Sequence, residues 1–542
     1  MSAERKTDVL IVGAGLGGCA AALAVCRRGF RAILTDPTDW IGGQLTSQAV
    51  PPDEHGWIEQ FGCTASYRQL REGIRKYYRD YYPLTEAARA DQHLNPGLGW
   101  VSPLCHEPQV ALTVLEAMLA PFHNAGKLTI LRQHAPVSAD QATGDRIASV
   151  TLSDLPSGDL LTITAGYFLD ASELGDLLDL AAVELVTGKE SAQETGEPHA
   201  PSAAQPTNAQ AFSMCFAVDY MANEDHTIER PAEYDFWRDF VPDLDPPWVG
   251  PMLRLTGMSP RTLEPVHYRF DPIREPPVAF AGLWTYRRIL ARDLCTPGSV
   301  DSDICLINWP MIDYVLGDLC TCDKNEIDHH IKQAKQQSLS MLYWLQTEYP
   351  TEHGSGGLPG LRLRPDVVGT QDGLAKYPYI RESRRIRAEF TVCEQHVSAD
   401  LRPDRDRAEY FHDSVGVGGY RIDLHPTSGG ANYLDVPTLP FQIPLGALIP
   451  IRVENILPAC KNLGVTHITN GCYRLHPVEW NVGEAAGELA SYCLENHTSP
   501  RGVLHNQQRL SSFQQQLLQS GIELKWPDDL KIEHGEPHRH AM

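Results

Sequence analysis

The segment from Val9 to Pro37, VLIVGAGLGGCAAALAVCRRGFRAILTDP, constrains the fold more than any other part of the chain. It begins with a short apolar run rich in β-branched residues, which predicts a buried strand at Val9–Val12. Three glycines in the spacing G-x-G-x-x-G come next, followed by small residues that predict a helix at Cys19–Arg28. Gly29 ends this helix, and Phe30–Leu34 predicts a second strand.

Each glycine of the turn has its own physical role. Gly13 permits a tight turn, Gly15 lets the backbone approach a pyrophosphate, and Gly18 lets the helix pack closely on the strand. The amides and the dipole at the N-terminus of the helix would face the phosphates. Asp36 ends the second strand, at the separation along the sequence from Gly18 at which an acidic residue binds ribose hydroxyls. The complete unit predicts a site for an adenine dinucleotide and is far more specific than a lone glycine triplet.

Composition limits the class of protein. With 542 residues the chain is long enough for two or three domains, and its 42% hydrophobic and 21% charged residues are typical of a globular enzyme. The net charge of −23 disfavours nucleic acid or an anionic membrane as a partner. No apolar run reaches the roughly 18 residues of a membrane helix, and MSAERKTD contains no apolar signal core. The thirteen cysteines are scattered without C-x-x-C, so we expect a protein of the reducing cytoplasm.

The order of the predicted elements narrows the fold. An insertion at about 51–104, with one helix at Tyr67–Tyr81, precedes a helix at Pro108–Ala125. Turn residues then separate three predicted strands, Leu128–Pro136, Arg146–Leu152 and Leu160–Leu169. A β-meander in this position is typical of FAD domains of the glutathione-reductase type and is unusual in NAD-dependent dehydrogenases. Another helix is predicted at Glu326–Thr347.

A second signature lies near the C-terminus. Ile456–Ala459 predicts a strand, and Gly483–Gly487 (GEAAG) is expected to open a helix that ends at Asn496. Small residues would let this helix lie against a flat ring. Amides from about Asn481 and Val482 would then stabilise negative charge at the N1/C2=O locus of a reduced flavin.

Four further motifs carry a resemblance to a known family. They are Pro378–Ile386 (PYIRESRRI), Trp40–Thr46 (WIGGQLT), Phe168–Ser172 with Gly175-Asp176, and Thr466-His467 with Gly471 and Arg474. With these motifs the chain resembles FAD-dependent oxidoreductases of the glutathione-reductase-type superfamily, in the branch with the signature P-x-R-E-S-R-R-I. The resemblance extends from residue 9 to residue 487 and implies FAD as the cofactor. We expect FAD to be bound non-covalently, with attachment to Cys63, Cys105 or His106 as the alternative.

The glycine turn, the ribose acid and the family positions together predict the cofactor contacts. Three positions depart from the family pattern: Asp36 replaces a glutamate, Ser172 replaces a threonine, and Cys460-Lys461-Asn462 replaces A-G-R or A-G-D. The predicted contacts are Gly13, Ala14, Gly15, Leu16, Gly17, Gly18, Asp36, Pro37, Gly42, Gly43, Gln44, Leu45, Val137, Asp170, Ala171, Asn462, Asn481 and Val482.

We therefore predict an α/β fold, in which a Rossmann-like FAD-binding domain with a parallel sheet and a β-meander carries an inserted α+β substrate domain. The FAD-binding domain would comprise 1–185 and 411–496, and the substrate domain 186–410. The polar residues 497–542 would form an extension, loose at its end HGEPHRHAM, and 190–208 a linker or mobile loop. We expect no metal site, and the sequence leaves the oligomeric state open.

The absence of two motifs narrows the chemistry. No second nucleotide-binding unit is visible, since Gly354–Gly360 (GSGGLPG) reads as a loop, and no C-x-x-C suggests a disulfide reductase. We expect an enzyme that oxidises a C–H bond of a small polar metabolite (an alcohol, an amine or an acid) and passes electrons to dioxygen or an external acceptor. The alternatives are a lyase or isomerase that keeps FAD in a structural or electrostatic role, and a flavin monooxygenase.

Four side chains are candidates for the substrate face. His476 and His425 are the candidate bases, because a neutral imidazole could take the proton as hydride leaves. Arg474 lies two positions before His476, and Arg384 could bind a carboxylate in a bidentate manner. Each has a structural alternative: the histidines could be turn or core residues, and the arginines of RESRR could brace two domains through Glu382. We expect the substrate to lie where the Gly42-Gly43 loop, the His425 region and Arg474–His476 meet.

Overall fold

The computed structural model describes residues 3–142, 144–274, 282–351 and 356–530. At its centre is a five-stranded parallel sheet with the strand order β23-β8-β2-β3-β4. The central strand β2 is the apolar run VLIV, and all four of its side chains are buried, as expected for a strand covered on both faces. The predicted α/β fold with a parallel sheet is confirmed. The strands are β2 (Val9–Val12), β3 (Ala32–Asp36), β4 (Leu128–Arg132), β8 (Tyr167–Asp170) and β23 (Ile456–Pro458).

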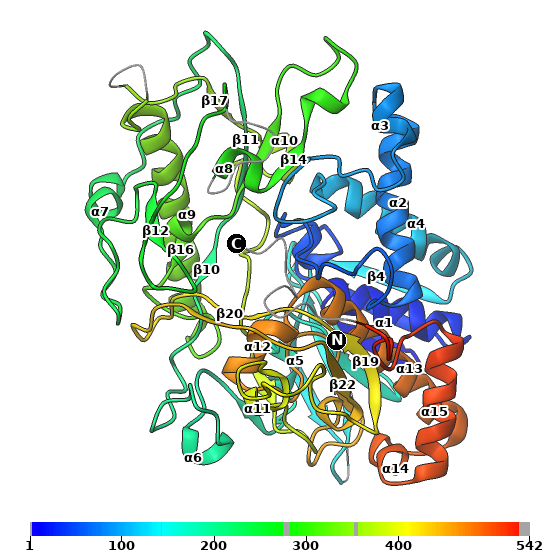
Figure 1. Ribbon diagram of the computed structural model, residues 1–542. Coiled ribbons are helices and arrows are strands. Elements are labelled where there is room, and N and C mark those ends of the chain that lie inside the picture. Colours follow the sequence, from blue (N-terminus) through cyan, green and yellow to red (C-terminus); the bar gives the residue numbers. More distant parts are fainter. Residues whose placement is uncertain (1–2, 143, 275–281, 352–355, 531–542) are drawn as a thin grey trace.

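Helices α1 (Leu16–Arg27) and α13 (His476–Asn496) pack along each other, although they come from opposite ends of the chain (Figure 1). Glycines make this close approach possible. A Cβ on Gly483 would lie 2.0 Å from the carbonyl oxygen of Gly17, and a Cβ on Gly17 would lie 1.8 Å from that of Ala459. The small residues of the GEAAG motif therefore serve the packing of α13 on α1, which corrects their expected role against a flat ring.

The predicted meander is present as an antiparallel sheet with a parallel edge strand, in the order β1-β7-β6-β5. Two predicted strands each prove to be two. The first breaks at Gln133, which has a φ of 55°, and the third breaks before Tyr167, so that β4 and β8 join the parallel sheet instead. The strands of this sheet are β1 (Ala3–Lys6), β5 (His134–Gln141), β6 (Ile147–Asp154) and β7 (Leu160–Thr164).

One helix of the inserted segment and the helix that follows the segment pack beside α1 and α13. The predicted helix at Tyr67–Tyr81 is α2 (Ala65–Tyr81), and the hydroxyl of Thr64 caps it by accepting a hydrogen bond from the amide of Tyr67. The predicted helix at Pro108–Ala125 is α4 (Pro108–Asn124), which packs on α2. A short helix, α3 (Glu86–Ala90), follows α2.

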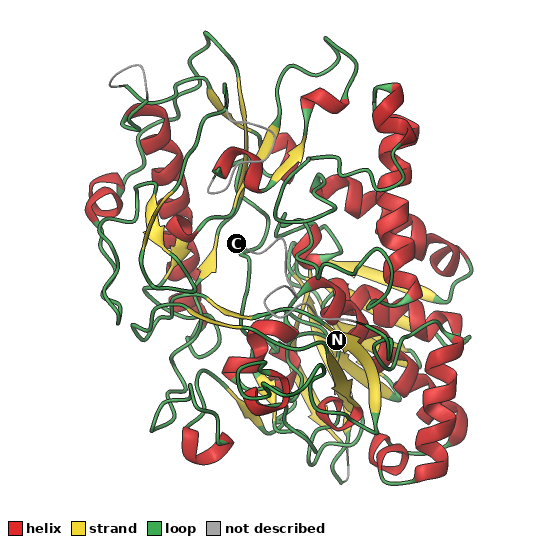
Figure 2. Cartoon of the chain, viewed as in Figure 1, coloured by secondary structure: helices red, strands yellow, loops and turns green. Residues whose placement is uncertain are grey.

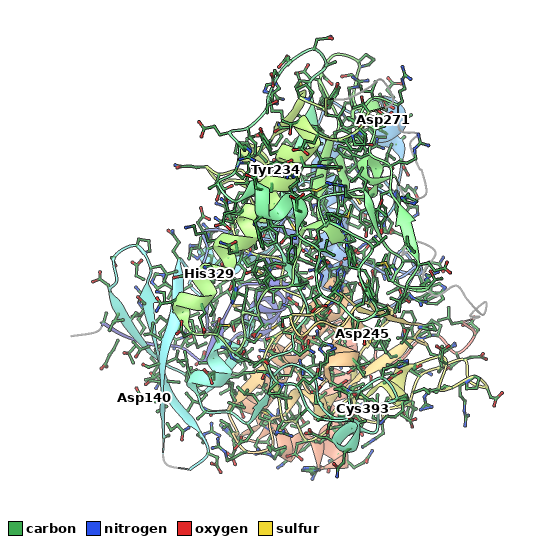
Figure 3. All side chains as sticks on the ribbon, turned by 90° about the vertical axis from the view of Figure 1, so that its left-hand side faces the viewer. Asp140, Tyr234, Asp245, Asp271, His329 and Cys393 are labelled. Atoms are coloured by element: carbon green, nitrogen blue, oxygen red, sulfur yellow. The ribbon has the colours of Figure 1, made fainter. Side chains whose placement is uncertain are left out.

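The middle of the chain builds a second apolar core around an antiparallel sheet with the order β14-β15-β11-β17. Helix α9 (Lys324–Thr347), which was predicted, lies against it and begins with a capping box between Asp323 and Glu326. Helix α7 (Tyr234–Asp239) packs on α9, and these elements form the upper left of Figure 1. In Figure 3, Tyr234 and His329 mark this part, and Asp140 marks the meander. The strands are β11 (Phe216–Tyr220), β14 (Arg288–Leu290), β15 (Ile304–Ile307) and β17 (Leu361–Leu363).

Short elements connect the two parts, and much of the chain there is loop (Figure 2). The short strands are β9 (Leu185–Val186), β10 (Phe212–Ser213), β12 (Thr256–Met258), β13 (Pro265–His267), β16 (Asp313–Tyr314), β18 (Arg385–Ile386), β19 (Ser414–Gly418), β20 (Ile422–Leu424), β21 (Leu434–Val436) and β22 (Phe441–Pro444). The short helices are α5 (Asp176–Leu180), α6 (Ala192–Thr195), α8 (Leu283–Tyr286), α10 (Pro365–Val368), α11 (Glu394–Val397) and α12 (His467–Tyr473).

Several local predictions need correction. Helix α13 begins at His476, seven residues before the expected start, because Pro477 occupies its first turn without disrupting it. Thr466 is the N-cap of α12, which places His467 of the family motif at the first position of a helix. The expected linker 190–208 contains α6 and buried side chains.

The polar extension also proves more structured than expected. It forms α14 (Pro500–Leu504) and α15 (Gln507–Gln519), both of which pack on α13. The end of the tail, HGEPHRHAM, lies outside the described residues, as does part of the predicted loop Gly354–Gly360.

All thirteen cysteines are free thiols, twelve of them buried. Within the described residues, no helix has the length and apolar character needed to span a membrane. Among these described residues, no group of histidine, cysteine and acidic side chains is suited to hold a metal ion.

Candidate functional site

The glycine turn joins β2 to α1 at the carboxyl end of the parallel sheet. Gly13 has a φ of +96°, a conformation that favours glycine. Gly15 is the N-cap of α1, no side chain caps the helix, and its first turn contains no acidic residue. The first amides of α1 and the positive end of its dipole are therefore free to bind an anion.

Asp36 stands beside this turn at the end of β3. Its Oδ2 accepts a hydrogen bond from the amide of Ala14 at 3.2 Å, and its Oδ1 accepts two from Thr38, at 2.8 Å from the amide and 2.7 Å from the hydroxyl. Burial raises the pKa of Asp36 to about 7, although the hydrogen bonds from Thr38 and Ala14 act in the opposite direction. The carboxyl group is thus fixed at the turn, with Pro37 directly after it.

The loop at Gly42-Gly43 closes over the same turn. The amide of Gly42 donates to the carbonyl of Ala14 at 2.6 Å, and a Cβ on Gly43 would lie 2.8 Å from the Cα of Gly15. Gln44 continues the loop and donates from Nε2 to Glu479 at 2.7 Å, and Leu45 is buried after it. The structure brings these predicted positions together with the glycine turn.

Other predicted contacts have clear structural partners. Asp170 accepts bonds from Ser172 and from the amide of Leu178, and Asn462 donates to the carbonyl of Asp170 at 3.0 Å. Ala171 follows at the end of β8, where its amide donates to the carbonyl of Val12. These residues hold together the ends of β2, β8 and β23 next to the turn.

Three predicted contacts are placed differently from what was expected. Because α13 starts at His476, the amides of Asn481 and Val482 lie inside the helix and not at its N-terminus. The Nδ2 of Asn481 donates to the carbonyl of Val415 at 3.2 Å. Val137 lies on β5 and is 46% exposed. The proposed stabilisation of negative charge by the amides of Asn481 and Val482 is therefore wrong.

A buried cation completes the surroundings of the turn. Lys461 is fully buried, and its Nζ pairs with the carboxylates of Glu173 and Glu479. A glycine turn that a side chain would fill, an uncapped helix N-terminus and a buried ammonium group form a suitable donor set for a pyrophosphate. The residues at this site therefore fit FAD.

A cavity of about 290 Å³ lies between the parallel-sheet part and the middle of the chain. It draws residues from the inserted segment, from 259–310 and from 379–474, which are far apart in the sequence. Its aromatic lining consists of Trp100, Tyr268, Tyr286, Tyr379, Tyr420 and Tyr433.

Five arginines line this cavity, and four of them form ion pairs with aspartates. The aspartates offset the charge of these four arginines, while guanidinium and carboxylate groups remain available for hydrogen bonds. The pairs are Arg287 with Asp53 (3.2 Å), Arg381 with Asp313 (3.0 Å), Arg474 with Asp423 (3.1 Å), and Arg421 with Asp435.

His425 is in the wall of the cavity, just after β20. Its Nδ1 lies 2.6 Å from Oδ2 of the buried Asp313. Burial raises the pKa of Asp313, but Arg381 and His425 outweigh this effect and the net shift is downward, so the carboxylate stays ionised. When the neutral ring donates from Nδ1, Nε2 keeps its lone pair as an acceptor. Nε2 lies 3.7 Å from Asp423, beyond hydrogen-bonding distance.

His476 is in a different environment. It is fully buried and does not line the cavity; its Nδ1 accepts a hydrogen bond from the amide of Asp53 at 3.0 Å. This bond places the ring proton on Nε2, for which the described part of the chain offers no hydrogen-bond partner. Burial lowers the pKa of His476 to about 3, against the opposing effect of Asp53. The ring is therefore neutral, with its only acceptor nitrogen already engaged.

The two predicted arginines, Arg474 and Arg384, also lie in different environments. Arg474 lines the cavity, and its NH1 donates to the hydroxyl of Tyr379 at 3.4 Å. Arg384 lies outside the cavity lining and donates to the carbonyl of Leu174 at 2.9 Å. Arg385 pairs with Glu382 at 2.6 Å, the bracing arrangement considered as the alternative for this motif. The arginine of the motif that reaches the cavity is Arg381.

Sequence reasoning missed several residues of the site. Arg381 belongs to the quoted motif, so its position relative to Glu382 was a usable signal. Asp313 carried no signal in the sequence, because 112 positions separate it from His425 and only the fold brings the two together. Lys461 did carry a signal, since it departs from the family pattern.

Comparisons with known proteins identify the family of this chain. A model of the family "FAD dependent oxidoreductase" matches residues 8–517. Hispidin-3-hydroxylase of Neonothopanus nambi is 42% identical over 62 residues, which span 11% of this chain and 15% of that protein.

Among solved structures, the flavin-dependent monooxygenase PieE in complex with FAD and substrate is 16% identical, with 40% of this chain and 36% of that chain covered and a TM-score of 0.23. L-Proline dehydrogenase from P. horikoshii is 13% identical, with 35% and 24% covered and a TM-score of 0.17. The family match covers nearly the whole chain, and the protein belongs to the FAD-dependent oxidoreductase family.

Proposed function

We propose that this enzyme oxidises a C–H bond of a small polar metabolite and passes the electrons to dioxygen or an external acceptor. When bound, FAD would supply the two-electron acceptor, flavin N5, for the hydride that leaves the substrate. The observation that carries the proposal is His425 in the cavity wall, with Asp313 on Nδ1 and an available Nε2.

In this proposal His425 takes the proton that leaves the substrate as its C–H bond is oxidised. The carboxylate of Asp313 fixes the ring orientation and tautomer, and it stabilises the imidazolium ion that forms. Because Asp313 is also held by Arg381 and by Ser213 at 2.7 Å, its position changes little when His425 gains charge.

The paired arginines of the cavity orient the substrate. Arg474 and Arg287 are each neutralised by an aspartate, so they favour hydrogen bonds to hydroxyl, amino or carboxyl groups over the binding of a highly charged anion. The aromatic lining excludes water from the substrate. This combination supports an alcohol, amine or acid with an apolar portion as the substrate class.

The proposal is tested by anaerobic mixing of the purified protein with a panel of alcohols, amines and hydroxy acids while the flavin absorbance is followed. We expect at least one compound to reduce the flavin, and His425→Ala to slow this step by about 10²- to 10⁴-fold, the usual contribution of a general base. Rapid reduction by NADPH or NADH at the rate of turnover would instead support a monooxygenase or reductase.

A further inference from the structure

Two buried carboxyl groups converge on the glycine turn, and neither is fully satisfied. Oε1 of Glu173 lies 2.9 Å, and Oε1 of Glu479 lies 3.5 Å, from the position that a Cβ on Gly15 would occupy. Both oxygen atoms are buried and have no hydrogen-bond partner among the residues that the structure describes. A buried carboxylate oxygen without a donor is costly. These two oxygens therefore mark a place that a group with donors or a proton should complete.

The other oxygen of each acid is already engaged. Lys461 Nζ pairs with Oε2 of Glu173 and lies 3.2 Å from Oε2 of Glu479, which also accepts a bond from Gln44. One ammonium group thus balances two carboxyl groups, which leaves the cluster one negative charge in excess when both are ionised. Further titratable groups that interact with the cluster are Asp36, Asp176, Tyr377 and Cys460.

A pyrophosphate bound at the N-terminus of α1 brings two negative charges next to these oxygens. Two ionised carboxylates would repel it, whereas a protonated carboxyl group would donate a hydrogen bond to it. We propose that the Glu173–Glu479 pair takes up a proton when FAD binds, that the protonated carboxyl donates to the pyrophosphate, and that Lys461 supplies the counter-charge. This inference rests on the placement of FAD at the glycine turn.

The pH dependence follows from the same geometry. Burial raises the pKa of Glu479 to about 7, with Lys461 acting in the opposite direction and Glu173 adding to the rise. FAD binds the protonated form more tightly and raises this pKa further. The affinity for FAD is therefore highest below pH 7 and falls as the pH rises, by at most tenfold per pH unit for one proton.

The chain offers a matched pair of variants. Glu479→Gln keeps the shape of the side chain, retains a hydrogen-bond donor and is uncharged at every pH. The affinity of this variant for FAD should therefore stay constant between pH 6 and 9. Glu484→Gln is the control: Glu484 lies on the same helix and is equally buried, but it faces Ser66 at 2.5 Å. The control should keep the pH dependence of the wild type.

The experiment is calorimetric titration of the apoprotein with FAD, from pH 6 to 9 and in two buffers of different ionisation enthalpy. We expect uptake of about one proton per FAD near pH 8 in the wild type and in Glu484→Gln, and none in Glu479→Gln. A pH-independent wild-type affinity, or proton uptake that persists in both Glu479→Gln and Glu173→Gln, would overturn the inference. Gly15→Val tests the placement of FAD separately, since full affinity in that variant would move the cofactor away from this turn.

Discussion

The contact between α1 and α13 yields a prediction whose size follows from the coordinates. In Gly483→Ala, the new Cβ would lie 2.0 Å from the carbonyl oxygen and 2.4 Å from the Cα of Gly17. Real Cβ contacts essentially never fall below 3.0 Å, so the two helices must separate by about 1 Å. Both neighbours are backbone atoms, and no side chain can rotate away.

The expected loss of stability combines two opposing terms. Overpacking costs about 1–3 kcal/mol, and the rigid backbone contact at Gly483 places this site at the upper end. Replacing a helical glycine with alanine returns about 1 kcal/mol. We therefore expect a net loss of about 2 kcal/mol in the free energy of unfolding, together with weaker retention of FAD, because the N-terminus of α1 moves.

Gly73→Ala provides the matched control. Gly73 lies within α2, where a Cβ would meet only the methyl group of Val114, at 2.6 Å. The gain in helix propensity is the same as in Gly483→Ala, and the Val114 side chain can adjust. The free energy of unfolding of this variant should therefore be within about 0.5 kcal/mol of the wild-type value. Denaturant unfolding followed by circular dichroism, with flavin release measured in parallel, gives both quantities. If Gly483→Ala is as stable as Gly73→Ala and retains its FAD, the packing argument is refuted.

Three further predictions concern single side chains. Asp313→Asn should slow flavin reduction by about 10- to 150-fold in stopped-flow measurements, the value of a hydrogen bond to a charged group, and should add little to His425→Ala because both act through one ring. Asp36→Ala should weaken FAD binding by about 10- to 150-fold in equilibrium dialysis; undiminished retention would mean that another residue holds the ribose. Burial raises the pKa of Glu382, but its partners His467 and Arg385 outweigh this and lower it to about 2. The wild type should thus lose stability as the pH falls from about 4.5 toward 2, and Glu382→Gln should lose less in acid unfolding curves.

The parts of the fold that follow from local pattern were predictable. The strand–turn–helix–strand unit at Val9–Asp36, the helix at Pro108 and the family motifs near Gly42 all depend on residues close together in the chain. The start of α13 was placed at Gly483 instead of His476, although Pro477 is compatible with a helix there, because proline is favoured in the first turn. Patterns at the ends of elements are the least informative.

The substrate side was predicted less well, because it is assembled by long-range packing. His425 and Arg474 were identified from nearby motifs and both line the cavity. His476, two positions after Arg474, turns inward because the first turn of α13 is completely buried. The partners Asp313 and Asp53 come from segments that carry no recognisable pattern, so only the folded chain places them.

The central claim is that the substrate gives its electrons to the bound cofactor. The most direct test counts product per flavin in a strictly anaerobic reaction without any added acceptor. The proposal predicts one oxidised product for each FAD, complete loss of the oxidised flavin spectrum, and then no further product until an acceptor is admitted. Product that continues to accumulate over many turnovers while the flavin stays oxidised would contradict it and identify a lyase or isomerase.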